Sequence, residues 1–212
     1  MALGRASCNL LLSARSTNDI SRNVKIVSKM AIVKHPAQRV GIFIDTANLY
    51  HSAKNLYKSK VNFGNVVKDA LAGRTLIRAI AYVISTEGGE EKAFFDALAK
   101  MGIETKSIDL QVFYGGAKKA DWDVGITIDA VVMAPKLDVA IIVSGDGDYV
   151  PLTDYLKMQG VQVEVAAFGR STSSKLREAT ESFLDLCDNP EKYLMKSIRR
   201  GGPKDGPEED NP

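Results

Sequence analysis

The sequence predicts an α/β fold in three layers, with a mostly parallel central sheet of about five strands and helices on both faces. Short apolar runs alternate along the chain with stretches of helical periodicity, which is typical of repeated strand–helix–strand units. The first run, at 40–44, is apolar throughout rather than at every second residue, as expected for a strand that is buried on both faces of a parallel sheet. At 212 residues, the chain is long enough to bury a sizeable core.

The predicted elements follow one another from residue 40 to residue 180. A first strand over 40–44 precedes a helix over 65–71 and a second strand over 77–84. A helix over 90–101 stops at Gly102, and a third strand lies within 103–113, with an interruption expected near 106–109. Then come a helix over 122–133, a strand over 139–143, a helix over 151–158 that Gly160 closes, a strand over 161–166 and a short helix over 173–180.

Both ends of the chain differ in composition from its middle. Residues 1–38 have Asp19 as their only acid among several Arg, Lys and Ser residues, which resembles a transit peptide. A disordered extension, or translation that begins at Met30, is favoured instead because no clear amphipathic helix is evident. Residues 190–212 are rich in Gly, Pro and charge, which predicts a disordered tail. One domain is therefore expected over 39–189.

Composition narrows the classes of function. The formal charge of +2 indicates no nucleic-acid partner by itself, although a local basic patch is compatible with one. Cys8 and Cys187 are too far apart for a metal-binding motif or a disulfide framework, so a reducing, cytoplasmic location is expected. Two histidines exclude a histidine-rich metal site. Since no apolar run approaches the roughly 18–20 residues that cross a bilayer, we expect a soluble protein.

Acidic and polar side chains follow two of the predicted strands. They are Asp45, Thr46 and Asn48 after the first strand, and Ser144, Asp146 and Asp148 after the strand at 139–143. In open α/β sheets, ligands bind beyond the carboxyl ends of the strands, where the strand order reverses. If these two strands are neighbours, three carboxylates converge there, and hard divalent cations prefer such oxygen ligands. A cation in that position can activate water and stabilise charge on a phosphate, as phosphodiester hydrolysis requires.

Each of these acids also has a structural interpretation. Asp45 could cap its strand and begin a turn, and Asp148 could be the N-cap of a helix that has Pro151 in its first turn. Gly145 and Gly147 flank Asp146, where they either let the backbone approach a ligand closely or are ordinary turn residues. The combination of two acid-bearing strands at one edge favours a metal site.

A second acidic stretch contributes Asp121, Asp123 and Asp129. On a helix, Asp123 lies near the N-terminus and Asp129 points about 120° away from it, so both cannot easily face one metal. Asp123 is therefore predicted as a fourth ligand, and Asp129 as a residue that orders the surroundings. The alternative for Asp121 and Asp123 is favourable negative charge at a helix N-terminus.

The segments GIFIDTANLY, KKADWDVGITIDAVV and IIVSGDGDYVPLTDYLKMQGVQVEV occur in this order, and together they resemble an NYN domain of the PIN-like nuclease superfamily, in its LabA-like branch. The resemblance covers about Arg39 to Asn189 and implies a metal-dependent ribonuclease with an acidic pocket on a parallel sheet. The motif positions are Asp45, Asn48, Asp123, Asp146 and Asp148, with Asp129 as a further acid. The first motif reads D-T-A-N where many relatives carry D-G-x-N or D-x-E-N, and the resemblance alone does not establish activity.

The resulting hypothesis is a metal-dependent nuclease, with RNA, expected to be single-stranded, as its substrate. Asp45, Asp123, Asp146 and Asp148 are expected to hold Mg²⁺ or Mn²⁺, with Asn48 fixing the geometry and Thr46, Ser144 and Asp129 around them. The residues expected to bind substrate are Lys118, Lys119, Trp122, Arg170 and Ser171. Tyr50, Tyr114 and Tyr149 are further candidates for base stacking, with ordinary packing as their alternative. Pairing of helical faces into a homodimer is also expected.

Other functions are compatible with parts of the pattern. A phosphatase with an aspartate nucleophile is disfavoured, because Ala47 occupies the position of its second aspartate. A receiver-like domain requires an acidic pair at the end of the first strand, which the sequence lacks. The evidence for a sugar transferase would consist only of Asp146 and Asp148, which could bind the metal of a nucleotide sugar. The main rival is a non-catalytic NYN-like module that binds RNA or a protein.

Overall fold

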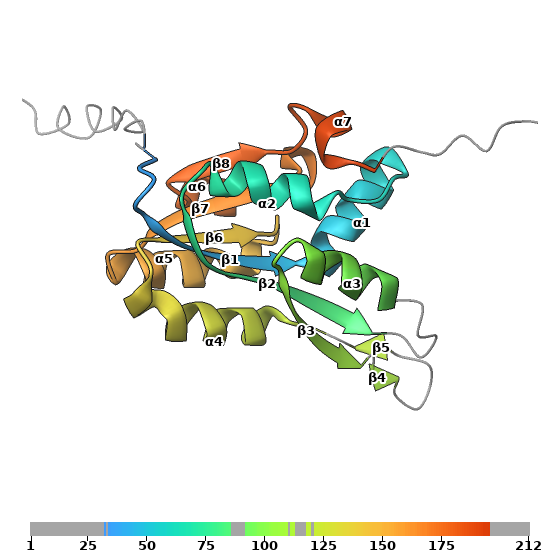
Figure 1. The fold of residues 1–212 in the computed structure, drawn as a ribbon, viewed down its shortest axis with the longest axis horizontal. Helices are drawn as coiled ribbons and strands as arrows, with labels where there is room; N and C mark the ends of the chain where they lie inside the picture. The colour runs from blue at the N-terminus through green and yellow to red at the C-terminus, as the bar shows by residue number, and fades with distance from the viewer. Residues whose placement is uncertain are drawn as a thin grey trace, which may run out of the picture. The chain divides into compact units, whose positions relative to one another are not determined.

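The computed structural model describes residues 32, 34–85, 92–109 and 121–195, together with the backbone of 111–112 and 118–119. Its central sheet has six parallel strands in the order β3-β2-β1-β6-β7-β8 (Figure 1). They are β1 (Arg39–Asp45), β2 (Thr75–Ser85), β3 (Glu104–Asp109), β6 (Val139–Val143), β7 (Gln162–Ala167) and β8 (Ser182–Asp185). The predicted parallel α/β architecture is confirmed, and β8 adds an edge strand to the expected set.

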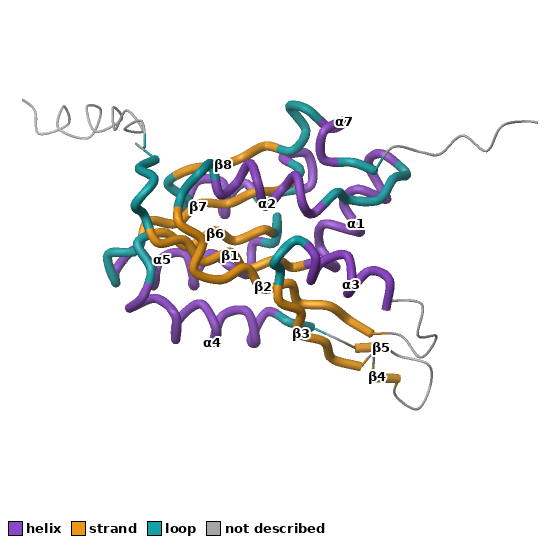
Figure 2. The backbone as a smooth tube through the Cα atoms, viewed as in Figure 1, coloured by secondary structure: helices purple, strands orange, loops and turns teal. Residues whose placement is uncertain are grey.

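Helices cover both faces of this sheet (Figure 2). The first face packs against α1 (Thr46–Tyr57), α2 (Phe63–Leu71), α3 (Lys92–Lys100) and α7 (Pro190–Tyr193). The second face packs against α4 (Asp123–Met133), α5 (Val150–Met158) and α6 (Ser174–Ala179). Successive strand residues enter opposite cores, because Ile42 and Ile44 face the first set of helices while Phe43 faces the second. The three predicted layers are therefore present.

Short elements complete the described chain. The 3-10 turns are η1 (Ala134–Lys136), η2 (Gly147–Tyr149) and η3 (Gly169–Ser171). A separate antiparallel pair joins β4 (Gln111–Val112) to β5 (Lys118–Lys119). No helix of the described residues is long and apolar enough to span a membrane.

The two central strands position the candidate site. Every residue of β6 is buried, as expected for a run of β-branched residues and alanine at the middle of a parallel sheet. In the register of β1 with β6, Ile44 lies beside Val143. The polar residues that follow, Asp45 and Ser144, therefore emerge at the same level of the sheet edge.

Two local predictions differ from the structure. Helix α1 was not predicted, because Asn48 and Ser52 interrupt the apolar stripe that Leu49 and Ala53 form on its buried side. The predicted break in the third strand is wrong, since β3 runs without interruption through Glu104–Asp109. Its polar side chains are accommodated because β3 is an edge strand that β2 pairs along its whole length.

The ends of the elements follow the expected turn chemistry. Gly102 and Gly160 have φ values of +73° and +78°, so the left-handed conformation that ends α3 and α5 requires glycine.

The folded part of the chain continues past residue 189 into α7, where Tyr193 is buried and donates a hydrogen bond to Asp69 (2.8 Å). Most of the predicted N-terminal extension, and residues 196–212 of the predicted tail, lie outside the described residues.

Candidate metal centre

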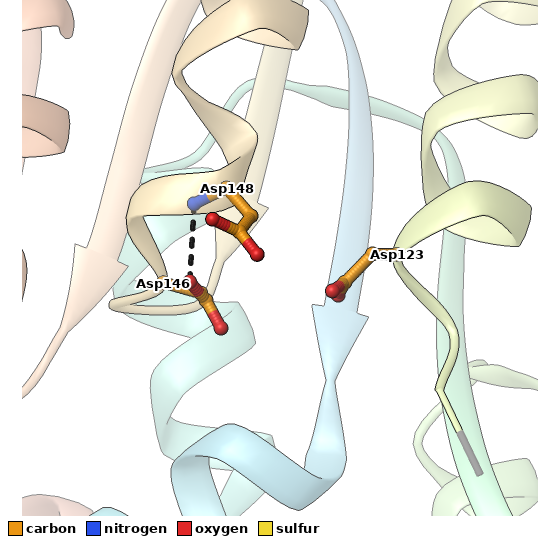
Figure 3. A group of neighbouring side chains, drawn as sticks. All are labelled: Asp123, Asp146 and Asp148. Atoms are coloured by element: carbon orange, nitrogen blue, oxygen red, sulfur yellow. Dashed lines mark hydrogen bonds between the residues drawn. The ribbon is translucent and has the colours of Figure 1, made fainter. Parts of the chain in front are cut away.

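Three carboxylates meet beyond the carboxyl ends of the central strands. Asp123 is the first residue of α4, Asp146 follows β6, and Asp148 lies in η2. One oxygen from each lies within 4.8 Å of the others, and Figure 3 shows the three side chains around a common space beside the end of β1. The strand order reverses between β1 and β6, which is where open α/β sheets bind their ligands.

Asp45 lies beside this group but not in it. Its Oδ1 accepts a hydrogen bond from the Asn48 backbone N–H (3.0 Å), so it is the N-cap of α1. Its Oδ2 accepts one from the Ser144 hydroxyl (3.2 Å). Burial raises the pKa of Asp45, and the nearby Asp146 charge raises it further, while these two hydrogen bonds oppose the rise. Asp45 therefore caps a helix, and it also lies next to the three clustered carboxylates.

Asn48 and Ser144 connect the ends of the two strands. The Asn48 side-chain oxygen accepts a hydrogen bond from the Gly145 N–H (2.9 Å), which ties α1 to the turn after β6. The Ser144 hydroxyl oxygen is fully buried and accepts one from the Asp146 N–H (3.2 Å). Thr46 is also buried, and its hydroxyl donates to the Tyr82 carbonyl of β2 (2.6 Å). These polar residues hold the backbone that carries the acids.

The turn after β6 has its cap at Asp146 rather than at Asp148. The Asp146 Oδ1 accepts a hydrogen bond from the Asp148 N–H (3.0 Å), which begins η2. Asp148 is exposed, and Pro151 lies in the first turn of α5 as expected. The alternative interpretation of Asp148 as a helix N-cap is therefore contradicted, and its carboxylate extends toward Asp123 and Asp146 (Figure 3).

Asp123 is held from the opposite side of the site. Its Oδ1 accepts a hydrogen bond from the Tyr149 hydroxyl (2.7 Å), and its N–H donates to the Asp121 carboxylate (2.8 Å). Asp121 thus serves the N-terminus of α4, which leaves the Asp123 side chain free for the cluster. Burial raises the pKa of Asp123 to about 6; the Tyr149 hydrogen bond lowers it, whereas the charges of Asp121 and Asp45 raise it.

The charge of this site is not compensated by the described part of the protein. None of the ion pairs among the described residues includes Asp45, Asp123, Asp146 or Asp148. Several carboxylates that lie close together and repel one another favour a bound cation. Their donor atoms are hard oxygens, which suit Mg²⁺ or Mn²⁺ better than softer metals. The residues therefore fit the implied divalent metal.

An open pocket of about 460 Å³ adjoins the acids on the side of β7. It is lined by Asn48, residues 145–147 and residues 170–173. The Ser173 N–H donates to the Gly145 carbonyl (2.9 Å), and a Cβ on Gly145 would lie 2.9 Å from the Thr172 Oγ1 and 3.1 Å from its Cα. The glycine at this position therefore allows close approach of the loop at 169–173.

Two predicted substrate-binding residues line this pocket. Arg170 is exposed, and the Ser171 Oγ lies 2.9 Å from the Ser52 Oγ of α1 and 3.1 Å from the Phe168 carbonyl oxygen. Lys118 and Lys119 form β5, but their side chains lie outside the described residues, as does Tyr114. The pocket thus combines one guanidinium group with several hydroxyl groups next to the acids.

Trp122 and Asp129 belong to a neighbouring cluster rather than to the acids. The Trp122 Nε1–H donates to the Val83 carbonyl (2.9 Å), and its ring meets the Tyr82 ring edge-on at 5.3 Å. The Asp129 Oδ2 accepts hydrogen bonds from the Tyr82 hydroxyl and the Lys106 ammonium, both at 2.6 Å. Asp129 therefore fixes α4 against β2 and β3.

Tyr149 is the site residue whose role the sequence did not indicate. It is fully buried, so it cannot stack on a base as suggested, and its hydroxyl holds Asp123. Its position after the acids of η2 was visible in the sequence, but its partner lies 26 residues earlier in the chain. Tyr50 remains accessible, with 41% of its surface exposed on α1.

Comparison with known proteins agrees with this geometry. The sequence model of the NYN domain family matches residues 39–187. The chain belongs to the NYN domain family. This NYN domain has the PIN-like, nuclease-type fold of that family, and the cluster of three aspartates lies at its carboxyl edge.

Two similar proteins indicate to which branch of the family this NYN domain belongs. It is 26% identical over 160 residues to the low amplitude and bright protein LabA of Synechococcus elongatus, covering 71% of this chain and 84% of that protein. A crystal structure of a protein of unknown function from Vibrio parahaemolyticus superposes with a TM-score of 0.69 at 28% identity, covering 77% of this chain and all of that one. The NYN domain is therefore LabA-like.

Proposed function

We propose that this NYN domain is a metal-dependent ribonuclease that hydrolyses phosphodiester bonds of single-stranded RNA. The observation that carries the proposal is the group of three carboxylates, Asp123, Asp146 and Asp148, whose oxygens lie within 4.8 Å of one another. These residues would hold Mg²⁺ or Mn²⁺, with Asp45 beside them. A divalent cation bound there supplies acidity toward water and stabilises negative charge on phosphate oxygens.

The surrounding residues orient this group. Asn48 and Ser144 fix the turn that carries Asp146, and Tyr149 fixes Asp123 through its hydroxyl. Neither histidine of the sequence lines the acidic group or the adjoining pocket as the structure describes them. In the proposed reaction, carboxylates and water therefore transfer the protons, rather than an imidazole.

The adjoining pocket supports a substrate that carries phosphate. Arg170 would pair with a backbone phosphate, and Ser171 would lie beside that phosphate in the same pocket. We also propose that the bound RNA contacts Lys118, Lys119 and Trp122 at nucleotides farther from the cleaved bond. A homodimer and a cytoplasmic location are likewise proposed, the location because two widely spaced cysteines suit a reducing compartment.

Cleavage of a labelled single-stranded RNA tests the proposal. The full chain is incubated with Mn²⁺, with Mg²⁺ or with a chelator, beside the Asp146→Asn variant. We expect metal-dependent cleavage that falls by at least about 100-fold in the variant, because loss of one carboxylate weakens both the charge and the geometry of the site.

Asp154→Asn is the matched control, since Asp154 is an exposed aspartate of α5 outside the acidic group. It should cleave as the wild type does. Cleavage that persists with chelator, or that survives in Asp146→Asn, would contradict the proposal. Binding of RNA by a folded, metal-loaded protein that cleaves none of several substrates would identify a non-catalytic binding module instead.

A further inference from the structure

The pocket beside the acids has a polar lining. Among the described residues that form it, which are Asn48, residues 145–147 and residues 170–173, none has an aromatic ring or a large aliphatic side chain. Proteins that hold the bases of single-stranded nucleic acids do so largely by stacking them on aromatic rings. The pocket therefore lacks the kind of surface that binds a nucleobase.

One hydroxyl group of the pocket has no partner among the described residues. The Ser171 and Thr172 hydroxyls donate to the Phe168 carbonyl oxygen, at 3.1 and 2.9 Å. Ser173 is the N-cap of α6 but forms no capping hydrogen bond with its side chain, and its Oγ takes part in none of the hydrogen bonds between described residues. A Cβ on Gly147 would lie 2.8 Å from this Oγ, so the Ser173 hydroxyl lies against the turn after β6. It is free to donate to a ligand beside that turn.

Two further donors complete the lining. The Asn48 side-chain oxygen accepts the hydrogen bond from the Gly145 N–H (2.9 Å), which fixes the orientation of the amide and leaves its NH2 group as a donor. Arg170 is exposed and belongs to none of the ion pairs between described residues. Guanidinium, amide NH2 and hydroxyl groups all donate hydrogen bonds, and ionised phosphate oxygens accept them. These three side chains therefore complement a phosphate group and the oxygens of its sugar.

The volume and the place of the pocket limit what it holds. Its volume of about 460 Å³ is in the lower half of the range of roughly 300–1,000 Å³ for ligand pockets. Asp146 belongs both to the acidic group and to the lining, so the two sites are contiguous. A strand whose cleaved phosphate lies at the acids would thus place the adjacent unit of its backbone in the pocket.

We propose that this pocket binds the phosphate and the ribose of the nucleotide next to the cleaved bond and leaves the base of that nucleotide in solvent. Arg170, Ser173 and Asn48 are the donors. They contact only the backbone, which is the same in every nucleotide, so cleavage does not depend on the base at this position. This role of the pocket deepens the proposed function and rests on it, because a ribonuclease is what brings an RNA strand to the acids.

Nuclear magnetic resonance titrations of the full chain test the pocket without any cleavage. The probes are ribose 5-phosphate, the 5′-monophosphates of adenosine and uridine, and the two free nucleosides, each added with chelator so that no cation attracts the phosphate. Ribose 5-phosphate and both nucleotides should shift the amide signals of Gly145, Gly147 and Ser173, with dissociation constants on the order of 1–10 mM that agree within about 3-fold. The nucleosides should leave these signals unchanged, because they lack the phosphate.

Substitutions of two donors test how the phosphate is held. Arg170→Ala should weaken the binding of ribose 5-phosphate by about 5- to 10-fold and Ser173→Ala by about 3-fold, because each removes a donor to the phosphate. Lys175→Ala is the matched control, since Lys175 is an exposed cation of α6 that does not line the pocket. Its loss removes the same charge nearby, and it should bind ribose 5-phosphate as the wild type does.

Cleavage with Mn²⁺ of RNA strands that differ in one central base tests the consequence for specificity. The bonds beside that base should be cut at rates that agree within about 3-fold. Nucleosides that bind as tightly as nucleotides, a preference of more than about 10-fold for one base, or equal losses of binding in Lys175→Ala and Arg170→Ala would overturn the inference.

The two proposals fail in different ways. A chain that binds ribose 5-phosphate in the pocket but cleaves no RNA would contradict the ribonuclease and the assignment of the pocket to an RNA strand, while the sugar-phosphate site would stand. Metal-dependent cleavage of RNA by a chain that binds no sugar phosphate at Gly145, Gly147 and Ser173 would overturn the role of the pocket alone.

Discussion

Asp123 retains its proton at higher pH than an ordinary aspartate does. Burial is the main cause; Asp121 and Asp45 add negative charge nearby, and the hydrogen bond from Tyr149 only partly offsets them. These effects raise its pKa from 3.8 to about 6. A proton therefore competes with a cation for this carboxylate in mildly acidic solution, while Asp146 and Asp148 contribute at the same site.

Metal affinity should follow this ionisation. We expect the affinity for Mn²⁺ to increase as pH rises from 5 through about 6 and to level off above 7, because the carboxylate that binds the cation must be ionised. Titration of the chelator-treated protein with Mn²⁺ at a series of pH values measures this directly. An affinity that is constant between pH 5 and pH 7 would contradict the role of Asp123.

Tyr149→Phe isolates the hydroxyl that holds Asp123. The ring stays in the core, so the free energy of unfolding should fall by only about 1 kcal/mol. Metal affinity should fall by about 10-fold, because Asp123 loses the bond that orients it and its pKa rises further. Calorimetric titration with Mn²⁺ at pH 7, together with thermal unfolding, separates the two effects.

Tyr82→Phe provides the comparison for this variant. Tyr82 is also buried, and its hydroxyl binds an aspartate of the same helix, Asp129, at 2.6 Å. Since Asp129 lies outside the acidic group, this variant should lose a similar amount of stability and keep its metal affinity. Equal losses of affinity in both variants would mean that the hydroxyls act on the packing of α4 rather than on the site.

At the scale of elements, the site depends on how closely the turn after β6 approaches the loop at 169–173. The contact is made by backbone at Gly145, whose absent Cβ would lie 3.1 Å from the Thr172 Cα. At Gly147 the nearest atom is the Ser173 Oγ, at 2.8 Å from the position of a Cβ. A side chain can rotate away, whereas the backbone of a packed loop cannot.

Gly145→Ala should therefore be the more damaging of two similar substitutions. We expect it to lower the free energy of unfolding by about 1–3 kcal/mol and to reduce metal affinity, because the displaced turn carries Asp146. Gly147→Ala should cost less, since Ser173 can move. Urea denaturation and Mn²⁺ titration of both variants measure the difference. If Gly147→Ala were the more destabilising, the loop would not be constrained as described.

At the scale of the whole domain, a buried ion pair joins the first layer of helices to the sheet. Arg74, after α2, donates two hydrogen bonds to the Glu164 carboxylate of β7, at 2.7 and 2.9 Å, and others to carbonyls at the end of α2. Its side chain is 0% exposed. Lys34 adds a contact to Glu164 at 3.2 Å. Neither residue of this pair belongs to the acidic group or lines the adjoining pocket, so the pair serves stability.

Glu164→Gln should lower the free energy of unfolding by about 3–5 kcal/mol, because it leaves the Arg74 charge buried without a counter-charge. Glu104→Gln removes an acid from a comparable bidentate pair with Arg78, but both side chains of that pair are more than 40% exposed, so its loss should be far smaller. Equilibrium urea denaturation compares the two, and similar losses would contradict the argument from burial.

This pair also gives stability a pH dependence. Burial tends to raise the pKa of Glu164, but its hydrogen bonds from Arg74 and the charge of Lys34 outweigh burial, and the pKa is lowered. A carboxyl group whose pKa is lower when folded stabilises the protein above its unfolded pKa and loses that contribution as pH falls through the folded pKa. Part of the acid sensitivity of the wild type should therefore be absent in Glu164→Gln.

The sequence by itself determined the architecture and the acids of the site. Continuous apolar runs at 40–44 and 139–143 predicted the two central strands, because a strand buried on both faces can contain little else. The other three predicted strands have a more mixed sequence, and β3 in particular is polar. Glycines at 102 and 160 marked helix ends that require a positive φ. It also placed Asp45, Asp146 and Asp148 at one edge, because parallel strands end together there. Local chemistry was sufficient for these predictions.

Only the tertiary structure decided how the acids share their roles. It separated Asp45, which caps α1, from the group of Asp123, Asp146 and Asp148, and it assigned Tyr149 to Asp123 across 26 residues of chain. It also revealed α1, whose Asn48 lines the pocket, and the exposed apolar side of α4. These features depend on which surfaces meet after the chain has folded, and periodicity within a segment carries no information about the segment that packs against it.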